Sequence, residues 1–509
     1  MDPFTTIPAE LRLQIFLSLQ SKTTISSLIQ ASPIMLKGYL GYKSTITRNL
    51  LDRDFDDQMI QDAMGIILFP SLSEARRSNS LVQEHFKSWE ARTFPNPLAT
   101  RDAFLIVQID KLHSLLMVFV EDYITKATAA FPPREYICLP QLTHSQSHLV
   151  FKGKAITRRL DSCNLSEGER RRLLRAFLRV ELMSLLQKTP SFISYSLIKR
   201  LHIGLISGVK IRDQEAIQCV WVYTSSLYGA VFAHCADAWL PVAEATPEAG
   251  LLFPDNLFAD PTQYGKDVGI NGVEEGSAIE SMAQYGFSLI FAIIRYAIAR
   301  PQDTNTLESF VKKLCSFRMN SFLQNSFRRA ISLGRFIPPN NMYYSTLNGG
   351  EGFHEQIWFK SLMDKLSPPH GRALQYKIFQ QRAWPFFDND RHYPKDTAML
   401  PLFPPQHFLD RMEQERIDEI TPLFGPGPVS NAQVQIKLRE FRRAQKWQDK
   451  MRPMKENVSN IEPSLPRTSI ANHEVSLPAI EKEEQLLTWS SRGVIQWDQS
   501  KEAYVLVKI

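Results

Sequence analysis

The chain has 509 residues, 44% of them hydrophobic and 11% aromatic, which excludes general disorder and allows one large core or two to three ordinary ones. The net charge of +6 arises in one segment, because residues 436–455 carry eight Lys or Arg against two acidic residues. The rest of the chain is neutral, so no global basic field indicates nucleic-acid binding. Five widely spaced cysteines without a Cys-x-x-Cys pair predict neither a disulfide framework nor a zinc ribbon, and indicate a reducing compartment.

The first predicted helix begins near Pro8, because a proline in the first turn loses no helical hydrogen bond, and Glu10 suits the positive end of the helix dipole. Helical spacing places its apolar residues on two stripes. One stripe holds Pro8, Leu11, Ile15 and Leu19, and the other holds Leu13, Phe16 and Leu17. An ordinary surface helix has one apolar stripe, so this helix is expected to pack on its own chain with one face and on a partner with the other.

Two further short helices are predicted. The second covers residues 24–32 and is stopped by Pro33. The third starts with Ser32 as its N-cap and Pro33 at its first position, and it runs to about Leu40.

At these residues the sequence resembles the F-box, the adaptor-binding module of SCF-type ubiquitin ligases. The family pattern is an apolar residue before Pro-x-Glu-Leu, then an Ile/Leu-Phe pair, a closing Leu, a spaced aliphatic pair and a small-residue segment. The chain meets it at Ile7-Pro8-Ala9-Glu10-Leu11, Ile15-Phe16, Leu19, Ile25, Leu28 and Ala31-Ser32. It departs from the family at residues 32–36, where many members have a Cys/Arg/Trp cluster.

The resemblance implies that the N-terminal helices bind the Skp adaptor, which hangs from a cullin. The residues expected to contact the adaptor are Ile7, Pro8, Leu11, Ile15, Phe16, Leu19 and Leu28. The alternative interpretation is that residues 6–40 are an amphipathic cap on a larger helical domain, since helices this short are marginal alone.

Helices are then predicted over residues 55–67, 73–89, 101–130, 192–207, 213–239, 277–299 and 307–333, and another starts at Ser166 with a core stripe that reaches Leu185. His113 is expected to be a packed core histidine, and Ser166 with Glu169 forms a capping box. Arg171, Arg172, Arg175 and Arg179 follow on one stripe, for which a solvated face is the first interpretation and a dock for an acidic peptide the second. The string from Ser166 to Arg179 resembles a segment of fungal F-box proteins of uncharacterised substrate, which suggests a fungal source.

Residues 338–428 hold twelve of the 31 prolines together with many aromatic residues, which predicts an irregular segment that wraps the helical core. Its aromatic side chains are expected to pack on that core, with a binding groove as the alternative. A basic helix is predicted at 431–451. Its basic side is expected to be solvated, and a nuclear-import patch or a dock for acidic partners is the alternative. Its candidate acidic-partner contacts are Arg439, Arg442, Arg443 and Lys446. Residues 494–497 and 504–507 predict a β-hairpin that must dock on the helical body.

The fold class predicted from these elements is mainly α. The organisation comprises an F-box (1–51), a helical body (52–335), a Pro/aromatic-rich irregular segment (336–430), a basic helix (431–452), a flexible linker (453–480) and a C-terminal hairpin segment (481–509). Two long runs have few charges: 214–236, broken only by Glu215, and 285–294. They are too polar or too short to span a bilayer, and buried core helices are expected there.

Signatures of catalysis are weak. Residues 151–155 lack the glycine and the Ser/Thr of a P-loop, residues 352–355 lack the second His of a zincin, and no Gly-x-Ser-x-Gly occurs. His144 and His148 have no Cys or carboxylate close in sequence. No catalytic residue, metal ligand or cofactor is therefore expected, and the chain is predicted not to be an enzyme.

The sequence thus predicts a substrate-recruiting F-box subunit of a cullin RING ubiquitin ligase, cytoplasmic or nuclear, without a nucleic-acid or membrane partner or a secretory signal. The target stays unassigned, because no propeller or leucine-rich repeat is visible. The alternatives are an adaptor-bound scaffold outside ubiquitination, a helical protein-interaction protein without a ligase role, and a helical enzyme with an adaptor tail.

Overall fold

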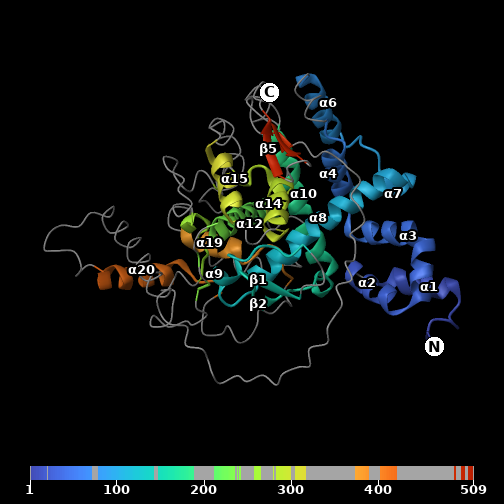
Figure 1. The fold of residues 1–509 in the computed structure, drawn as a ribbon, viewed down its shortest axis with the longest axis horizontal. Helices are drawn as coiled ribbons and strands as arrows, with labels where there is room; N and C mark the ends of the chain where they lie inside the picture. The colour runs from blue at the N-terminus through green and yellow to red at the C-terminus, as the bar shows by residue number, and fades with distance from the viewer. Residues whose placement is uncertain are drawn as a thin grey trace, which may run out of the picture. The chain divides into compact units, whose positions relative to one another are not determined.

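The computed structural model describes residues 2–19, 21–70, 78–142, 147–188, 211–235, 238, 240–241, 257–264, 279, 282–299, 304–316, 373–388, 402–420, 487–488, 494–498 and 503–507. The described part is mainly α, which confirms the predicted fold class (Figure 1). The chain divides into two compact units, Met1–Met412 and Glu413–Ile509. Residues 1–51 and the helical body therefore belong to one unit.

Three helices open the first unit: α1 (Ala9–Ser18), α2 (Lys22–Ala31) and α3 (Pro33–Asp54). The Ser32 side chain caps α3 by accepting a hydrogen bond from the Met35 N–H, and Pro33 occupies the first turn, as predicted. The expectation that the third helix ends near Leu40 was wrong, because α3 continues for 22 residues and buries Ile46, Leu50 and Leu51 along the way.

The helices that follow are α4 (Asp57–Ile67), α6 (Asn79–Glu90), α7 (Pro97–Thr100), α8 (Ala103–Ala127) and α9 (Pro132–Glu135). The Asp56 carboxylate caps α4 and the Asp102 carboxylate caps α8, each by accepting a backbone N–H of the first turn. His113 lies buried on α8, as expected.

A short antiparallel hairpin, β1 (His148–Phe151) and β2 (Lys154–Arg158), was not predicted from the sequence. Phe151 pairs with Lys154 across a two-residue turn. Lys152 and Gly153 both have positive φ, 47° and 85°, as a tight turn matched to the strand twist requires. The Lys-Gly dipeptide after an apolar strand was the signal for it.

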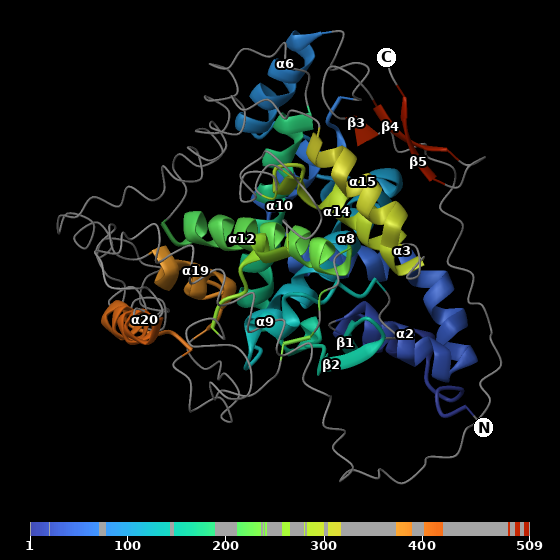
Figure 2. The ribbon, with the colours of Figure 1, turned by 60° about the vertical axis from the view of Figure 1, so that its left-hand side comes forward.

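The central helices are α10 (Glu167–Lys188), α12 (Ile211–Cys235) and α14 (Gly286–Ala299), and they pack on one another while α10 also packs on α8 (Figures 1 and 2). The helix α15 (Thr304–Ser316) packs on α12 and α14. Two short 3-10 turns, η1 (Ser162–Asn164) and η3 (Pro261–Tyr264), complete this part. The predicted capping box is confirmed, because Ser166 Oγ accepts the Glu169 N–H at 3.1 Å and the Glu169 carboxylate accepts the Ser166 N–H at 3.0 Å.

Among the described residues, α8 and α12 are long and apolar enough to cross a membrane by length and composition alone. The expectation that residues 214–236 are too polar to cross a membrane was therefore wrong. The packing of α12 is nevertheless that of a core helix, because 94% of its apolar window is buried by the rest of the chain. Only half of the corresponding window of α8 is buried.

The helix α19 (Ala373–Gln381) and the turn after it belong to the core, although they lie far along the chain. The Tyr123 hydroxyl donates to the Gln380 carbonyl at 2.6 Å, and the fully buried Arg382 donates to backbone carbonyls at the end of α8. The aromatic side chains of Trp384, Phe386 and Phe387 are buried, which confirms that aromatic residues of the proline-rich segment pack on the core.

The helix α20 (Gln406–Ile420) crosses the boundary between the units. The second unit contains a three-stranded antiparallel sheet of β3 (Leu487–Thr488), β4 (Val494–Asp498) and β5 (Ala503–Val507), in the order β3-β4-β5. Trp497 pairs with Tyr504, so the predicted hairpin is confirmed and β3 is an addition to it. The predictions for residues 192–207 and 431–480, and for most of the proline-rich segment, lie outside the described residues.

Candidate adaptor-binding surface

The three N-terminal helices enclose a small hydrophobic core of their own. Its buried members are Phe16, Ile25, Met35, Ile46 and Leu50. The Phe16 ring lies 5.9 Å from the Tyr39 ring, and α1 and α2 both pack on α3. A core of this kind allows helices that are marginal alone to hold a fixed arrangement.

Asp2 fixes the chain that leads into α1. Its carboxylate accepts hydrogen bonds from Ser32 Oγ at 2.6 Å and from the backbone N–H of Phe4 at 2.9 Å. These two hydrogen bonds, the one from Ser32 first, lower the pKa of Asp2 below its ordinary value. The residues before α1 are thereby held against the start of α3.

The residues predicted to contact the adaptor do not share one environment. Leu11 keeps 56% of its surface exposed and Pro8 is also exposed. Ile7 is half-buried. Three further residues are half-buried and pack on the small core: Ile15, Leu19 and Leu28. This divided exposure gives α1 an inner and an outer apolar side.

Phe16 is the exception among them, because it is 0% exposed at the centre of the small core. The structure therefore places it away from any surface that a partner can reach while the core stays intact. The reason is packing: Met35 and Tyr39 of α3 cover the side of α1 on which Phe16 lies.

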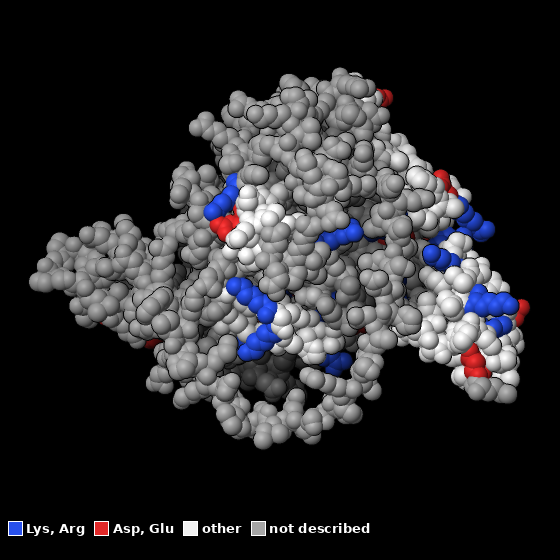
Figure 3. Space-filling view, in the orientation of Figure 1, with Lys and Arg blue, Asp and Glu red and all other residues white. Residues whose placement is uncertain are grey.

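Sequence reasoning did not include two exposed leucines of α3, Leu36 and Leu40, in the site. Leu40 is 66% exposed and Leu36 is also exposed. They are four residues apart and hence neighbours on one side of the helix. That i, i+4 spacing was the available signal. Figure 3 shows the N-terminal helices as mostly uncharged surface with charged side chains between.

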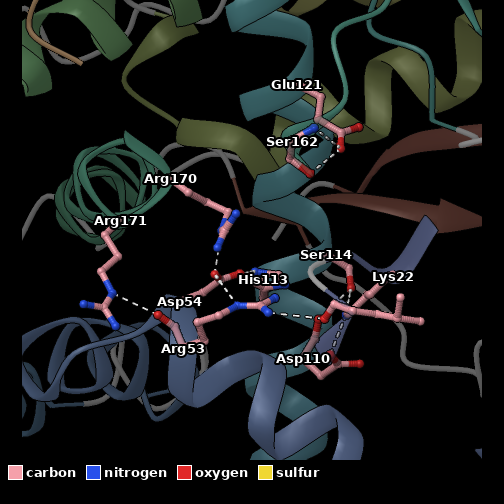
Figure 4. Close-up of polar contacts among 11 residues, drawn as sticks. Lys22, Arg53, Asp54, Asp110, His113, Ser114, Glu121, Ser162, Arg170 and Arg171 are labelled. Carbon is pink, nitrogen blue, oxygen red and sulfur yellow. Dashed lines mark hydrogen bonds and ion pairs between the residues drawn. The ribbon is translucent and has the colours of Figure 1, made fainter. Parts of the chain in front are cut away.

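Polar contacts join the N-terminal helices to α8 and α10 of the body (Figure 4). At the first, the Lys22 ammonium donates to the Asp110 carboxylate and, at 2.7 Å, to Ser114 Oγ. At the second, the buried Asp54 carboxylate lies between His113 and Arg170, 3.0 Å from His113 Nε2 and 2.6 Å from Arg170 Nε.

Asp54 keeps its charge although it is buried. Burial by itself raises the pKa of a carboxyl group, but the hydrogen bonds and positive charges of His113 and Arg170 outweigh it and hold the pKa of Asp54 below its ordinary value. An ionised carboxylate is therefore the stable form at this junction at neutral pH.

The arginine stripe of α10 is only partly solvated: Arg179 is buried, whereas the side chains of Arg171 and Arg175 are 39% and 30% exposed. The stripe binds the chain's own residues. Arg171 Nε donates to the Arg53 carbonyl at 2.9 Å, and Arg179 Nε lies 2.7 Å from the Asp62 carboxylate. The remaining pairs of the stripe are Arg172 with Asp388 and Arg175 with Asp56.

Three buried polar side chains of the body, Lys126, Asp122 and Tyr223, bind one another. Lys126 Nζ lies 2.6 Å from the Asp122 carboxylate, which also accepts from the Tyr223 hydroxyl at 2.7 Å. All three side chains are closed off from solvent. In the part of the chain that the structure describes, no group of three or more His, Cys, Asp or Glu is placed to hold a metal ion.

The candidate contacts on the basic helix, Arg439, Arg442, Arg443 and Lys446, lie outside the described residues. No protein-family model, curated protein or solved structure matches this chain. The features of the chain that bear on its function are therefore the N-terminal motif and the surface of α1 and α3.

Proposed function

We propose that this chain is a substrate-recruiting subunit of an SCF-type ubiquitin ligase that binds the Skp adaptor with the outer side of α1 and α3. The body would hold a target protein, and the adaptor would link it to a cullin. The contribution of such a subunit is proximity, since tethering raises the effective concentration of target lysines without a catalytic side chain. No nucleic acid, membrane, metal or cofactor takes part in this proposal.

The observation that carries the proposal is the exposure of Leu11 beside the complete burial of Phe16 on the same short helix. The small core is already filled without Leu11, so this side chain adds nothing to it. Leu36 and Leu40 are further exposed apolar side chains on α3, the helix on which α1 packs. Neighbouring exposed apolar side chains on packed helices are typical of a protein-protein contact surface.

Energetics favour burial of this surface by a partner. Covering apolar surface contributes about 25 cal/mol per Å², and a well-buried leucine contributes about 1.5–3 kcal/mol relative to an exposed one. Ile7, Ile15, Leu19 and Leu28 each retain part of their surface and would add to the contact. The proposed contact set therefore keeps six of the seven residues named from the motif, omits Phe16, and gains Leu36 and Leu40.

Co-purification tests the proposal directly. The full chain is co-expressed with the Skp adaptor, and Leu11→Asp and Leu40→Asp are expected to reduce the adaptor yield about tenfold or more while the helical circular dichroism signal stays unchanged. Leu81→Asp is the matched control, because Leu81 is an exposed leucine of α6, outside the N-terminal helices. Equal adaptor yield for Leu11→Asp and wild type would contradict the proposal.

A second readout separates the ligase subunit from an adaptor-bound scaffold. A ligase subunit is expected to bring the cullin into the complex through the adaptor and to shorten the half-life of its target. A scaffold would retain the adaptor and leave turnover unchanged.

A further inference from the structure

The first half of α8 carries an exposed apolar ridge. Phe104 is 70% exposed and Val107 is 51% exposed, while Ile106 and Ile109 on the opposite side of the helix are buried. Residues 104 and 107 are three apart and lie one above the other on the helix surface. Lys111 continues the same side one turn later and is also exposed. We name Phe104, Val107 and Lys111 the α8 ridge.

Positive charge borders the ridge at both ends, with Arg101 just before the helix and Lys111 within it, both exposed. Two carboxylates lie close to these cations in the sequence, and one of them has a counter-charge of its own. Asp110 pairs with Lys22, whereas Asp102 caps α8 by accepting the Leu105 N–H at 3.0 Å and keeps its negative charge, so Arg101 and Lys111 face one uncompensated carboxylate. The ridge therefore presents apolar side chains with a net positive border.

Arg101 occupies a backbone position that favours glycine. It ends α7 in the left-handed conformation, with φ of 59°, and the next N–H, of Asp102, bonds back to the Pro97 carbonyl at 3.2 Å. Helices that end in this way usually have glycine there, since a side chain is disfavoured at positive φ. This conformation places Arg101 directly before the first turn of α8, next to the ridge.

We propose that the α8 ridge binds an acidic peptide segment of a partner protein, with apolar side chains of that segment packed on Phe104 and Val107 and its carboxylates facing Arg101 and Lys111. This inference stands without the proposed function, because the ridge lies on α8 and the proposed adaptor contacts lie on α1 and α3.

Charge and size favour this occupant over the alternatives. A second copy of the chain packed symmetrically would bring the same positive border against itself, and like charges oppose that contact. A membrane surface is bound by a longer apolar helix face with several basic residues, whereas the exposed apolar pair here spans about one turn.

The test uses the full-length chain and two fluorescein-labelled helical peptides of the same length. Both carry Leu and Phe with i, i+3 spacing, and their other positions are mostly Glu in one peptide and Lys in the other. Fluorescence anisotropy is expected to show binding of the Glu peptide only, weakened by added salt. Phe104→Ser and Val107→Ser should each weaken binding about fivefold or more, while the exposed-leucine control Leu81→Ser leaves it unchanged.

Arg101→Gly is the most informative substitution, because a structural role and a binding role of Arg101 lead to different changes in stability and in peptide binding. Relief of the positive φ is expected to leave the melting temperature no lower than that of the wild type, while Glu-peptide binding weakens and loses part of its salt dependence. A lower melting temperature with unchanged binding would overturn the proposal.

Three further outcomes would also overturn the proposal. The first is binding of the Lys peptide with the same affinity as the Glu peptide, and the second is a concentration-dependent dimer in sedimentation velocity that Phe104→Ser abolishes. The third is Phe104-dependent binding to vesicles of phosphatidylcholine and phosphatidylserine that is as strong as binding to the Glu peptide. Leu11→Asp is expected to leave peptide binding unchanged. Failure of the ridge and failure of the adaptor contact are therefore distinguishable.

Discussion

Asp54 joins the N-terminal helices to the body, and Asp54→Asn removes its charge while it keeps the size of the side chain. The side chain is 5% exposed and Arg170, its partner at 2.6 Å, is 4% exposed, so the substitution leaves a buried guanidinium without its counter-charge. Breaking a buried pair in this way costs about 3–5 kcal/mol, whereas an exposed pair contributes about 1 kcal/mol or less. We expect a loss near 3 kcal/mol, since His113 can still hydrogen-bond to the amide.

The matched control is Asp56→Asn, two residues along the chain. The Asp56 pair with Arg175 is about one-third exposed on both sides, and asparagine retains the cap of α4 that Asp56 provides. Urea unfolding of the full chain, followed by circular dichroism, is expected to show a loss of 1 kcal/mol or less for this control, on the order of an exposed pair. Equal and small losses for both variants would refute the reasoning about the buried junction.

The pH dependence of the same pair follows from the lowered pKa of Asp54. Because the folded pKa lies below the unfolded value of about 3.9, the stabilisation is fully present above that value and is lost as the pH falls through the folded pKa. The stability difference between wild type and Asp54→Asn is therefore expected to narrow as the pH falls from about 5 to below about 4. A difference that stays constant or grows between about pH 5 and pH 3 would contradict the charge assignment.

Three further substitutions have defined outcomes in the same unfolding assay. Phe16→Ala empties the centre of the small core and should cost about 3–5 kcal/mol, unlike an exposed position such as Leu11→Ala at about 0.5 kcal/mol or less. Gly286→Ala introduces a side chain at φ of 69° against the buried Glu181 carboxylate and should cost about 2–3 kcal/mol. Ser166→Ala removes one half of the capping box and should cost about 1 kcal/mol. Losses below the unfolding error for Phe16→Ala or Gly286→Ala, or none for Ser166→Ala, would contradict the packing and capping described.

Local features were predictable because their partners are close in sequence. The cap of α3 by Ser32 and the capping box of Ser166 with Glu169 each involve residues three apart, and both are present. The hairpin β1–β2 is equally local, but the sequence-based prediction compared Lys152 and Gly153 only with the P-loop motif. The apolar run at residues 149–151 before them, followed by Lys-Gly, is the local signal for this hairpin.

Long-range partners were not predictable from one sequence. Asp54 and Arg170 are 116 residues apart, and Arg172 bonds to the Phe386 carbonyl 214 residues away. Helical spacing showed that the arginines share one side of α10, but it carried no information on which segments return to cover that side. An arginine stripe covered by the chain's own carboxylates and carbonyls has the same pattern as a solvated one.

The candidate site likewise combines a feature that the sequence predicts with one that only the packing of the helices decides. Periodicity separated Leu11 and Phe16 onto two sides of α1, and it could not tell which side faces inward, because both are apolar. Met35 and Tyr39 of α3 decide it by packing on the Phe16 side. The exposed position of Leu40 likewise depends on the full length and packing of α3, which the sequence-based prediction ended too early.

The measurement that tests the central claim most directly is side-chain footprinting of the full chain by hydroxyl radicals, with and without the purified Skp adaptor. The account predicts that the adaptor protects Leu11, Leu36 and Leu40 from oxidation, while the reactivity of Phe104 on α8 does not change. Oxidation of all three leucines at the same rate in the presence and absence of the adaptor would contradict the claim that the outer side of α1 and α3 is the adaptor-binding surface.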